Sequence, residues 1–268
     1  MMYLLSDEGR QAMKAAAAKR LLYAFDFDGT LAPLSPHRHS VRMSHTVLEG
    51  LHALTKRAPC AVVSGRSLAD LAPRIDGAAV YLIGNHGLEA PGSSAADLER
   101  AEQACSQWKR ELVVGLAQLP LMQGAEVEDK RYSLTVHLRR TMDPDRAAGE
   151  VCRLLRRLTP TPQIMMGTYS INVLPSEQEG KGVATVALMT QLGRNGLLYI
   201  GDEETDETVF AMPHGVVLGI RIGQSTNTQA KFYLNHQEEI EEVLRCLVRD
   251  LDVLDEPLDR QGSELRYG

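Results

Sequence analysis

The segment AFDFDGTLAP, residues 24–33, places Asp26 and Asp28 directly after an apolar run. In a regular strand, residues two positions apart point to the same side. Gly29 follows at once and permits a sharp change in chain direction, so the carboxyl group of Asp28 can turn away from that of Asp26. Carboxylates can attack phosphorus or exchange protons with a leaving group or water. The pair therefore indicates a displacement in which one aspartate attacks and the other carries protons.

Three other polar clusters follow apolar stretches: Ser64-Gly65-Arg66, Asn85-His86-Gly87 and Gly201-Asp202-Glu203. Lys181 lies at the start of an expected helix. A carboxylate that approaches a phosphate dianion meets about 8 kcal/mol of repulsion at about 4 Å and an effective dielectric constant of about 20. We expect carboxylate-bound Mg²⁺ and the Lys181 ammonium to offset it, and the Ser64 hydroxyl and helix-start N–H groups to bind phosphate oxygens.

The elements that would position these clusters alternate between strand and helix. Buried strands are expected at 20–26, 59–65, 79–85, 197–202 and 215–223, and helices at 44–57, 67–75, 180–193 and 236–251. Such alternation is typical of an α/β fold, with a parallel sheet covered on both faces. Because ligands bind at the carboxyl ends of such strands, the polar clusters are expected to meet in one crevice.

The middle of the chain has a different pattern. An amphipathic helix is expected at 97–119, alternating strands within 126–140 and 168–174, and a helix after Asp143-Pro144. This order predicts an antiparallel sheet with helices on one side, which would bury Trp108. We expect a core of residues 1–95 and 176–268, interrupted by a cap of residues 96–175. The linkers near 90–96 and 175–180, which contain Pro91, Gly92, Pro175 and Gly180, are the expected hinges.

Bulk composition limits the class of protein. The 268 residues are 44% hydrophobic and 24% charged, which is typical of a folded globular protein. The charge of 29 − 35 = −6, without a basic run, argues against a nucleic-acid partner. No apolar run is long enough to span a membrane, and no secretory signal is recognisable. The four scattered cysteines, Cys60, Cys105, Cys152 and Cys246, are typical of reduced core thiols. We therefore expect a cytoplasmic protein, and a monomer.

The motifs DFDGTL, SGR, GKG and GDEETDE, in this order, resemble those of the haloacid-dehalogenase (HAD) phosphatases. The resemblance implies a Rossmann-like core with an inserted C2-type α/β cap. It implies Asp26 as nucleophile, Asp28 as acid and base, and Ser64 and Lys181 as phosphate ligands. It also implies Mg²⁺ held by Asp26, the backbone carbonyl of Asp28 and Asp202, with Asp206 nearby as a support or as a further acid of the metal site.

A narrower resemblance covers roughly residues 20–250. DFDGTLAP, SGR, GNHGLE, EDKRYSLTVHLR and GDEETDE are similar to segments of the trehalose-6-phosphate phosphatases. This implies trehalose 6-phosphate as substrate and the following substrate-binding residues: Ser64, Gly65, Arg66 and His86 in the core, and Glu128, Lys130 and Asn172 in the cap. Two positions depart from the family. Glu203 stands where an aspartate is usual, and Asn172 stands where a glutamate is frequent. Glu177 or Glu179 would compensate for the missing glutamate at position 172.

Other interpretations of the residues remain open. One is a phosphatase of the same superfamily that acts on sucrose phosphate or a glycosyl phosphoglycerate, and another is a phosphomutase. A third is a phospho-receiver or a sugar-phosphate sensor without turnover. Asp28, placed to speed hydrolysis of an aspartyl-phosphate, argues against storage of the phosphoryl group, whereas Asn172 and Glu203 keep the sensor open. On the cap strand at 126–140, we interpret the side chains of His137 and Arg139 as a solvated face.

Overall fold

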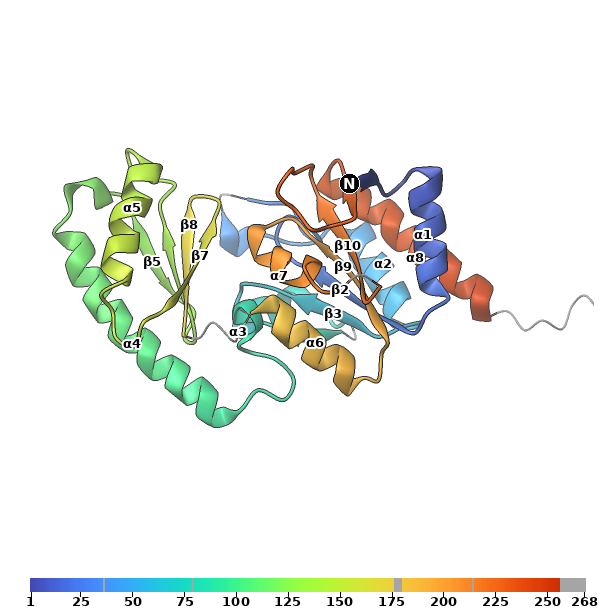
Figure 1. Cartoon of the computed structure of the whole chain (residues 1–268), viewed down its shortest axis with the longest axis horizontal. Helices are drawn as coiled ribbons and strands as arrows, with labels where there is room; N and C mark the ends of the chain where they lie inside the picture. Colours follow the sequence, from blue (N-terminus) through green and yellow to red (C-terminus); the bar gives the residue numbers. More distant parts are fainter. Residues whose placement is uncertain (36, 79, 176–179, 214, 256–268) are drawn as a thin grey trace, which may run out of the picture.

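The larger of two sheets carries the carboxyl ends predicted to form the site (Figure 1). The structure is a computed structural model that describes residues 1–35, 37–78, 80–175, 180–213 and 215–255. Over these residues, seven strands pair in parallel in the order β1-β11-β10-β9-β2-β3-β4. Their bounds are β1 Met2–Tyr3, β2 Leu21–Asp26, β3 Cys60–Val63, β4 Tyr81–Ile83, β9 Gly196–Gly201, β10 Val217–Ile222 and β11 Phe232–Leu234. The α/β expectation is confirmed.

Helices cover both faces of this sheet, as the apolar strands require. One face packs against α1 Asp7–Ala17, α2 His45–Thr55 and α8 Ile240–Asp255, and the other against α6 Lys181–Gln191 and α7 Glu207–Phe210. Central strands β2 and β9 are buried along their whole length, as parallel strands between two helical layers must be. Helix α2 begins after Ser44, whose Oγ accepts a hydrogen bond from the Val47 N–H, as an N-cap serine does.

The smaller sheet is antiparallel and lies beside the carboxyl ends of the first (Figure 1). Its order is β5-β6-β8-β7, with bounds β5 Glu126–Asp129, β6 Leu134–His137, β7 Gln163–Gly167 and β8 Ser170–Leu174. Helices α4 Ala95–Ala117 and α5 Pro144–Leu155 pack on one face only. Trp108 is buried there, as predicted, and donates to the Pro160 carbonyl. The opposite face is free to carry polar side chains toward the core.

Short elements were the ones that sequence patterns did not predict. Strands β1 and β11 are two and three residues long and extend the sheet beyond β10. The helix expected at 67–75 is α3 Leu68–Leu71 followed by a 3₁₀ turn. The six 3₁₀ helices of the described chain are η1 Arg38–Ser40, η2 Ala72–Arg74, η3 Asn85–Gly87, η4 Pro120–Met122, η5 Glu204–Asp206 and η6 Gln237–Glu239.

Two further expectations concern thiols and membranes. All four cysteines are free, and three of them are buried. Within the residues that the structure describes, no helix combines the length and the apolar character needed to cross a bilayer.

Candidate active site

Strand β2 ends at Asp26, the residue expected to attack, and buries it. Lys181, the first residue of α6, donates from Nζ to Asp26 Oδ1 at 2.7 Å and to Asp206 Oδ1 at 2.8 Å. Lys181 is only 1% exposed, so its ammonium has lost nearly all contact with water. Burial acts to lower the pKa of Lys181, but the Asp206 and Asp26 carboxylates outweigh it and raise that pKa well above its usual value. Lys181 is therefore held as a cation beside Asp26.

Three carboxylates meet around this ammonium. Oxygen atoms of Asp26, Asp202 and Asp206 lie within 4.8 Å of one another. Burial raises the pKa of Asp26 well above its usual value, and the other acids raise it further. Burial and the neighbouring carboxylates of Asp206 and Glu203 raise the pKa of Asp202 to about 7. One lysine does not balance this negative charge, and a clustered set of carboxylate oxygens is the chemistry that a hard divalent cation requires.

The members of the cluster differ in how many of their lone pairs are already used. Asp206 accepts hydrogen bonds from Lys181 Nζ, from the Tyr199 hydroxyl at 2.7 Å and from the Glu203 N–H at 2.9 Å. Asp202 is approached by the Thr30 hydroxyl at 3.4 Å, at the limit of a hydrogen bond. Asp206 is thus engaged as a support, whereas Asp202 retains capacity for a cation.

Gly29 brings the loop after Asp28 against Asp202. Its φ of +82° is in the region that favours glycine, and its N–H donates to the Ala32 carbonyl at 2.7 Å. A Cβ atom at this position would lie 2.2 Å from Asp202 Oδ2. The glycine therefore serves both the sharp turn predicted from the sequence and the close approach of this loop to the acid cluster.

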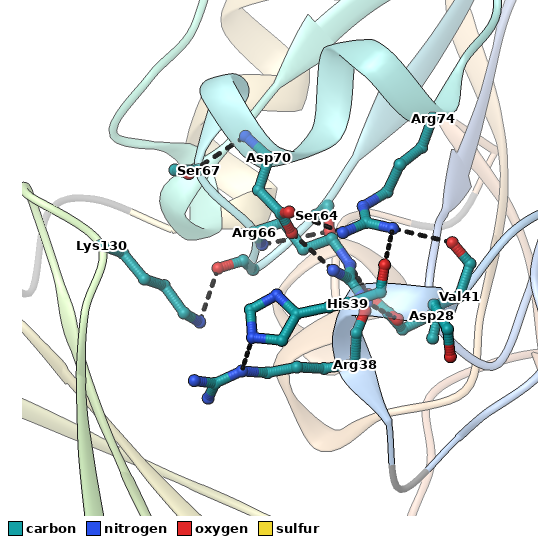
Figure 2. Close-up of polar contacts among 12 residues, drawn as sticks. Asp28, Arg38, His39, Val41, Ser64, Arg66, Ser67, Asp70, Arg74 and Lys130 are labelled. Atoms are coloured by element: carbon teal, nitrogen blue, oxygen red, sulfur yellow. Dashed lines mark hydrogen bonds and ion pairs between the residues drawn. The ribbon is translucent and has the colours of Figure 1, made fainter.

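Asp28 has a partner that the sequence analysis did not assign (Figure 2). Arg66 donates from Nε and from Nη2 to the two oxygens of Asp28, each at 2.6 Å. Arg66 Nη1 also donates to Asp70 Oδ2, and Arg74 Nη2 donates to Asp70 Oδ1 at 2.6 Å. We expected Arg66 to contact substrate. Its guanidinium lines the same cavity, but most of its N–H groups are used to hold Asp28, Asp70 and the Arg38 carbonyl.

The Ser64-Gly65 turn and His86 pack directly against each other. A Cβ atom on Gly65 would lie 2.4 Å from His86 Cε1, so no larger residue fits between the turn and the ring. His86 is 3% exposed, and neither ring nitrogen has a hydrogen-bond partner among the described residues. Burial lowers the pKa of His86 well below its usual value, and the nearby Lys130 and Lys181 ammonium groups lower it further. The imidazole is therefore neutral.

The polar face of the cap sheet approaches this turn. Lys130, just after β5, donates from Nζ to the Gly65 carbonyl at 2.8 Å. On β8, Asn172 Oδ1 accepts a hydrogen bond from the Thr135 hydroxyl at 2.9 Å. The core residue Asn85 accepts from Ser133 Oγ at 2.5 Å. The contacts of Lys130 and Ser133 hold the cap against the carboxyl ends of the core strands, whereas the Thr135–Asn172 contact joins β6 and β8 within the cap.

Two residues that sequence reasoning did not assign to the site, Arg38 of the core and His137 of the cap, meet at Glu128. Arg38, in the core turn η1, donates to Glu126 Oε1 at 3.0 Å and to Glu128 Oε2 at 2.9 Å. His137 Nε2 lies 2.8 Å from the same Glu128 oxygen. Burial alone would raise the pKa of Glu128, but the His137 hydrogen bond and the charges of Lys130 and Arg38 lower it to about 2. His137 is thus part of the cavity wall, not of a solvated face.

A cavity of about 600 Å³ lies between core and cap. All predicted site residues except Lys181 and Asp206 line it: Asp26, Asp28, Ser64, Gly65, Arg66, His86, Glu128, Lys130, Asn172 and Asp202. Lys181 lies behind Asp26. Glu177 and Glu179, considered as compensating acids, lie outside the described residues. Carboxylates therefore line the floor of the cavity, with the Lys181 ammonium behind them, and polar side chains line its cap side.

The family model and the curated relatives indicate one family, and a solved structure shares the fold. The family model described as trehalose-phosphatase matches residues 24–238. The chain is 29% identical to trehalose 6-phosphate phosphatase RA3 of Zea mays over 258 residues, covering 88% of this chain and 72% of the maize protein. It is 31% identical over 240 residues to trehalose-phosphate phosphatase of Mycobacterium tuberculosis, covering 85% of this chain but only 61% of that protein. The C-terminal domain of C. albicans trehalose-6-phosphate phosphatase shares the fold, with a TM-score of 0.69 and 21% identity over 93% of this chain and 98% of that one.

Proposed function

Because the chain belongs to the trehalose-phosphatase family, we propose that it is a Mg²⁺-dependent phosphatase that hydrolyses trehalose 6-phosphate to trehalose and phosphate. The observation that carries the proposal is the buried set of Asp26, Lys181 and Asp202 on the floor of a cavity with polar cap residues opposite. A phosphate group fits the floor, and a hydroxyl-rich leaving group fits the cap side.

In the first step, a carboxylate oxygen of Asp26 attacks phosphorus while the bond from phosphorus to the sugar oxygen breaks. Asp28 donates a proton to that sugar oxygen, so trehalose leaves as a neutral alcohol. In the second step, Asp28 takes a proton from water, whose oxygen attacks phosphorus. The bond to Asp26 breaks, inorganic phosphate leaves, and both aspartates return to their starting state.

The charge of the phosphoryl group is met by fixed donors. The Lys181 ammonium, which lies beside Asp26, and the Ser64 hydroxyl bind its oxygens. Asp26, the backbone carbonyl of Asp28 and Asp202 would hold Mg²⁺, which would supply the remaining positive charge that two approaching anions require. The excess of carboxylate over ammonium charge in the cluster, with the raised pKa of Asp202, fits such an ion.

Sugar recognition in this proposal comes from both sides of the cavity. Glu128, Lys130 and Asn172 accept or donate hydrogen bonds to sugar hydroxyl groups from the cap. Gly65, Arg66 and His86 delimit the core side. Closure of the cap over the substrate excludes bulk water from the aspartyl-phosphate until trehalose has left.

The proposal includes the expected organisation and setting of the protein. The core comprises residues 1–95 and 176–268, and the cap residues 96–175. The protein acts as a cytoplasmic monomer on a small sugar phosphate, without a nucleic-acid or membrane partner.

Phosphate release from a panel of sugar phosphates with Mg²⁺ tests the function. The panel contains trehalose 6-phosphate, sucrose 6-phosphate, a glucosyl phosphoglycerate and glucose 6-phosphate. We expect kcat/KM for trehalose 6-phosphate to exceed the others by about ten-fold or more. Glucose 6-phosphate and the glucosyl phosphoglycerate lack a second sugar unit for the cap residues, and sucrose 6-phosphate joins its glucose unit to fructose instead of glucose. Preference for another ester would reject the substrate, and tight binding without turnover would instead favour the sensor.

A further inference from the structure

The core turn η1 reaches the cap through one side chain, that of Arg38. Its Nη2 atom donates to Glu126 Oε1 at 3.0 Å, and its Nη1 atom donates to Glu128 Oε2 at 2.9 Å. Nη1 also lies 2.7 Å from His137 Nε2. A planar guanidinium can bridge two carboxylates in a fixed geometry, which the single ammonium group of a lysine cannot do. Arg38 therefore fixes the relative positions of cap side chains on β5 and β6.

The contacts to Glu128 are confined to one of its oxygens. Arg38 and His137 both lie against Oε2, at 2.9 and 2.8 Å. Oε1 accepts no hydrogen bond from any residue in the described part of the chain, and Glu128 lines the cavity. An ionised carboxylate oxygen with unused lone pairs is a strong acceptor for hydroxyl groups. Arg38 thus holds Glu128 in place while one of its oxygens stays available.

The backbone of the same segment supports the groups that hold Asp28 (Figure 2). The Arg38 carbonyl accepts a hydrogen bond from Arg66 Nη2 at 3.0 Å. Arg74 Nη1 donates to the His39 and Val41 carbonyls at 3.2 and 2.8 Å. The segment is therefore held by the core through its carbonyl groups and contacts the cap through the Arg38 side chain.

We propose that Arg38 is a positioning residue for the sugar: it orients Glu128 toward a substrate hydroxyl group when the cap lies against the core. The inference rests on the proposed function, because it names how that site recognises the part of the substrate beyond the phosphate. Since the core supplies the arginine and the cap the glutamate, the complete acceptor exists only when the two are together. An ester without sugar hydroxyl groups does not need it.

Steady-state kinetics on two substrates tests the inference. Trehalose 6-phosphate carries the hydroxyl groups, and p-nitrophenyl phosphate carries none. In Arg38→Ala, we expect KM for trehalose 6-phosphate to rise about ten-fold or more, the loss associated with a charge-assisted hydrogen bond. Turnover of p-nitrophenyl phosphate should stay within about two-fold, because the residue 38 carbonyl still supports Arg66. Arg38→Lys should recover only part of the loss.

Two controls separate positioning from general damage. Arg42 is in the same segment, but within the described part of the chain it donates only to the His39 and Val41 carbonyls. Arg42→Ala should therefore leave the kinetics of both substrates unaffected. The Arg38→Ala/Glu128→Gln double variant should lose little more than Glu128→Gln alone, since Arg38 acts through Glu128.

The outcomes decide between the alternatives. An unchanged KM for trehalose 6-phosphate in Arg38→Ala, or an equal loss on both esters, overturns the role of Arg38. If the wild-type protein instead hydrolyses another sugar phosphate, the proposed substrate is wrong. The Arg38 comparison is then made with that ester against p-nitrophenyl phosphate, and it still decides whether Arg38 positions Glu128.

Discussion

Arg66 holds both carboxylate oxygens of Asp28, with Nε and Nη2 each 2.6 Å from one of them. Such a two-point contact fixes the plane of the carboxyl group as well as its position. Asp70 and Arg74 continue the contact to the 38–41 segment, so Asp28 is held by a chain of alternating charges. Each Asp28 oxygen keeps a second lone pair beside its contact to Arg66, and this is where a proton is taken up and released in the proposed reaction.

Arg66→Lys should therefore slow every ester. One ammonium group cannot bind both oxygens of Asp28, and the loss of one charge-assisted hydrogen bond corresponds to a decrease in kcat of about ten- to a hundred-fold. Trehalose 6-phosphate and p-nitrophenyl phosphate should be affected alike, in contrast to Arg38→Ala. Initial-rate kinetics measures both constants, and the thermal unfolding midpoint checks that the fold persists. An unchanged kcat would mean that Asp28 does not need this contact.

The neutral, buried His86 gives a pH dependence of stability. Its folded-state pKa lies well below its usual value because of burial first and the nearby lysines second. Below about pH 6.5 this histidine is protonated in the unfolded state but stays neutral in the folded state. The free energy of unfolding therefore falls by about 1.4 kcal/mol for each pH unit below that value. Stability should be full above about pH 6.5 and decrease as the pH falls.

His86→Asn should remove this dependence. The residue has a φ of 57°, which asparagine tolerates better than most residues, so the backbone is preserved. Urea unfolding measures the change in the free energy of unfolding between about pH 7 and about pH 5.5. His45→Asn is the control, since the His45 side chain is 83% exposed. If the free energy of unfolding changes equally with pH in the wild-type protein and in His86→Asn, His86 is not the source of the pH dependence.

Without Mg²⁺, the contribution of Asp202 to stability should depend on pH in the direction opposite to that of His86. Burial, with Asp206 and Glu203, raises the pKa of Asp202 to about 7. Without metal, the folded state therefore binds this proton more tightly than the unfolded state, and stability falls as the pH rises from about 4 to about 7. Mg²⁺ competes with the proton, so the gain in melting temperature on adding Mg²⁺ should increase up to about pH 7 and then level off.

Differential scanning fluorimetry with Mg²⁺ or a chelator measures this gain independently of activity. Asp202→Asn should abolish most of it at every pH, because it removes both the titrating group and a ligand. A Mg²⁺ effect that is undiminished in this variant would show that the ion binds elsewhere.

Much of the fold followed from local patterns. The apolar runs at 20–26 and 197–202 and the N-cap at Ser44 predicted β2, β9 and α2. Strands β1 and β11 were not predicted because segments of two or three residues show no periodicity. They are strands only because segments far apart in the sequence pair with each other.

The site residues that lie at the carboxyl ends of strands could be predicted from the sequence. The contacts between segments far apart in the sequence could not. Asp26, Ser64 and Asp202 follow buried strands, so one rule of α/β sheets brought them together. Arg38 lies in an irregular segment and meets Glu128, which is 90 positions away, so no spacing indicated it. For His137, the alternating pattern gave the right face of β6, but it carried no information that the core covers this face.

The most direct test of the account is Mg²⁺-dependent release of inorganic phosphate from trehalose 6-phosphate by the wild-type protein and by Asp26→Asn. Asparagine keeps the shape of the carboxyl group but cannot attack phosphorus, so we predict rapid release by the wild-type protein and a loss of about 10³-fold or more in the variant. A chelator should stop the wild-type reaction. Comparable turnover by Asp26→Asn, or no release from trehalose 6-phosphate while another sugar phosphate is hydrolysed well, would contradict the account.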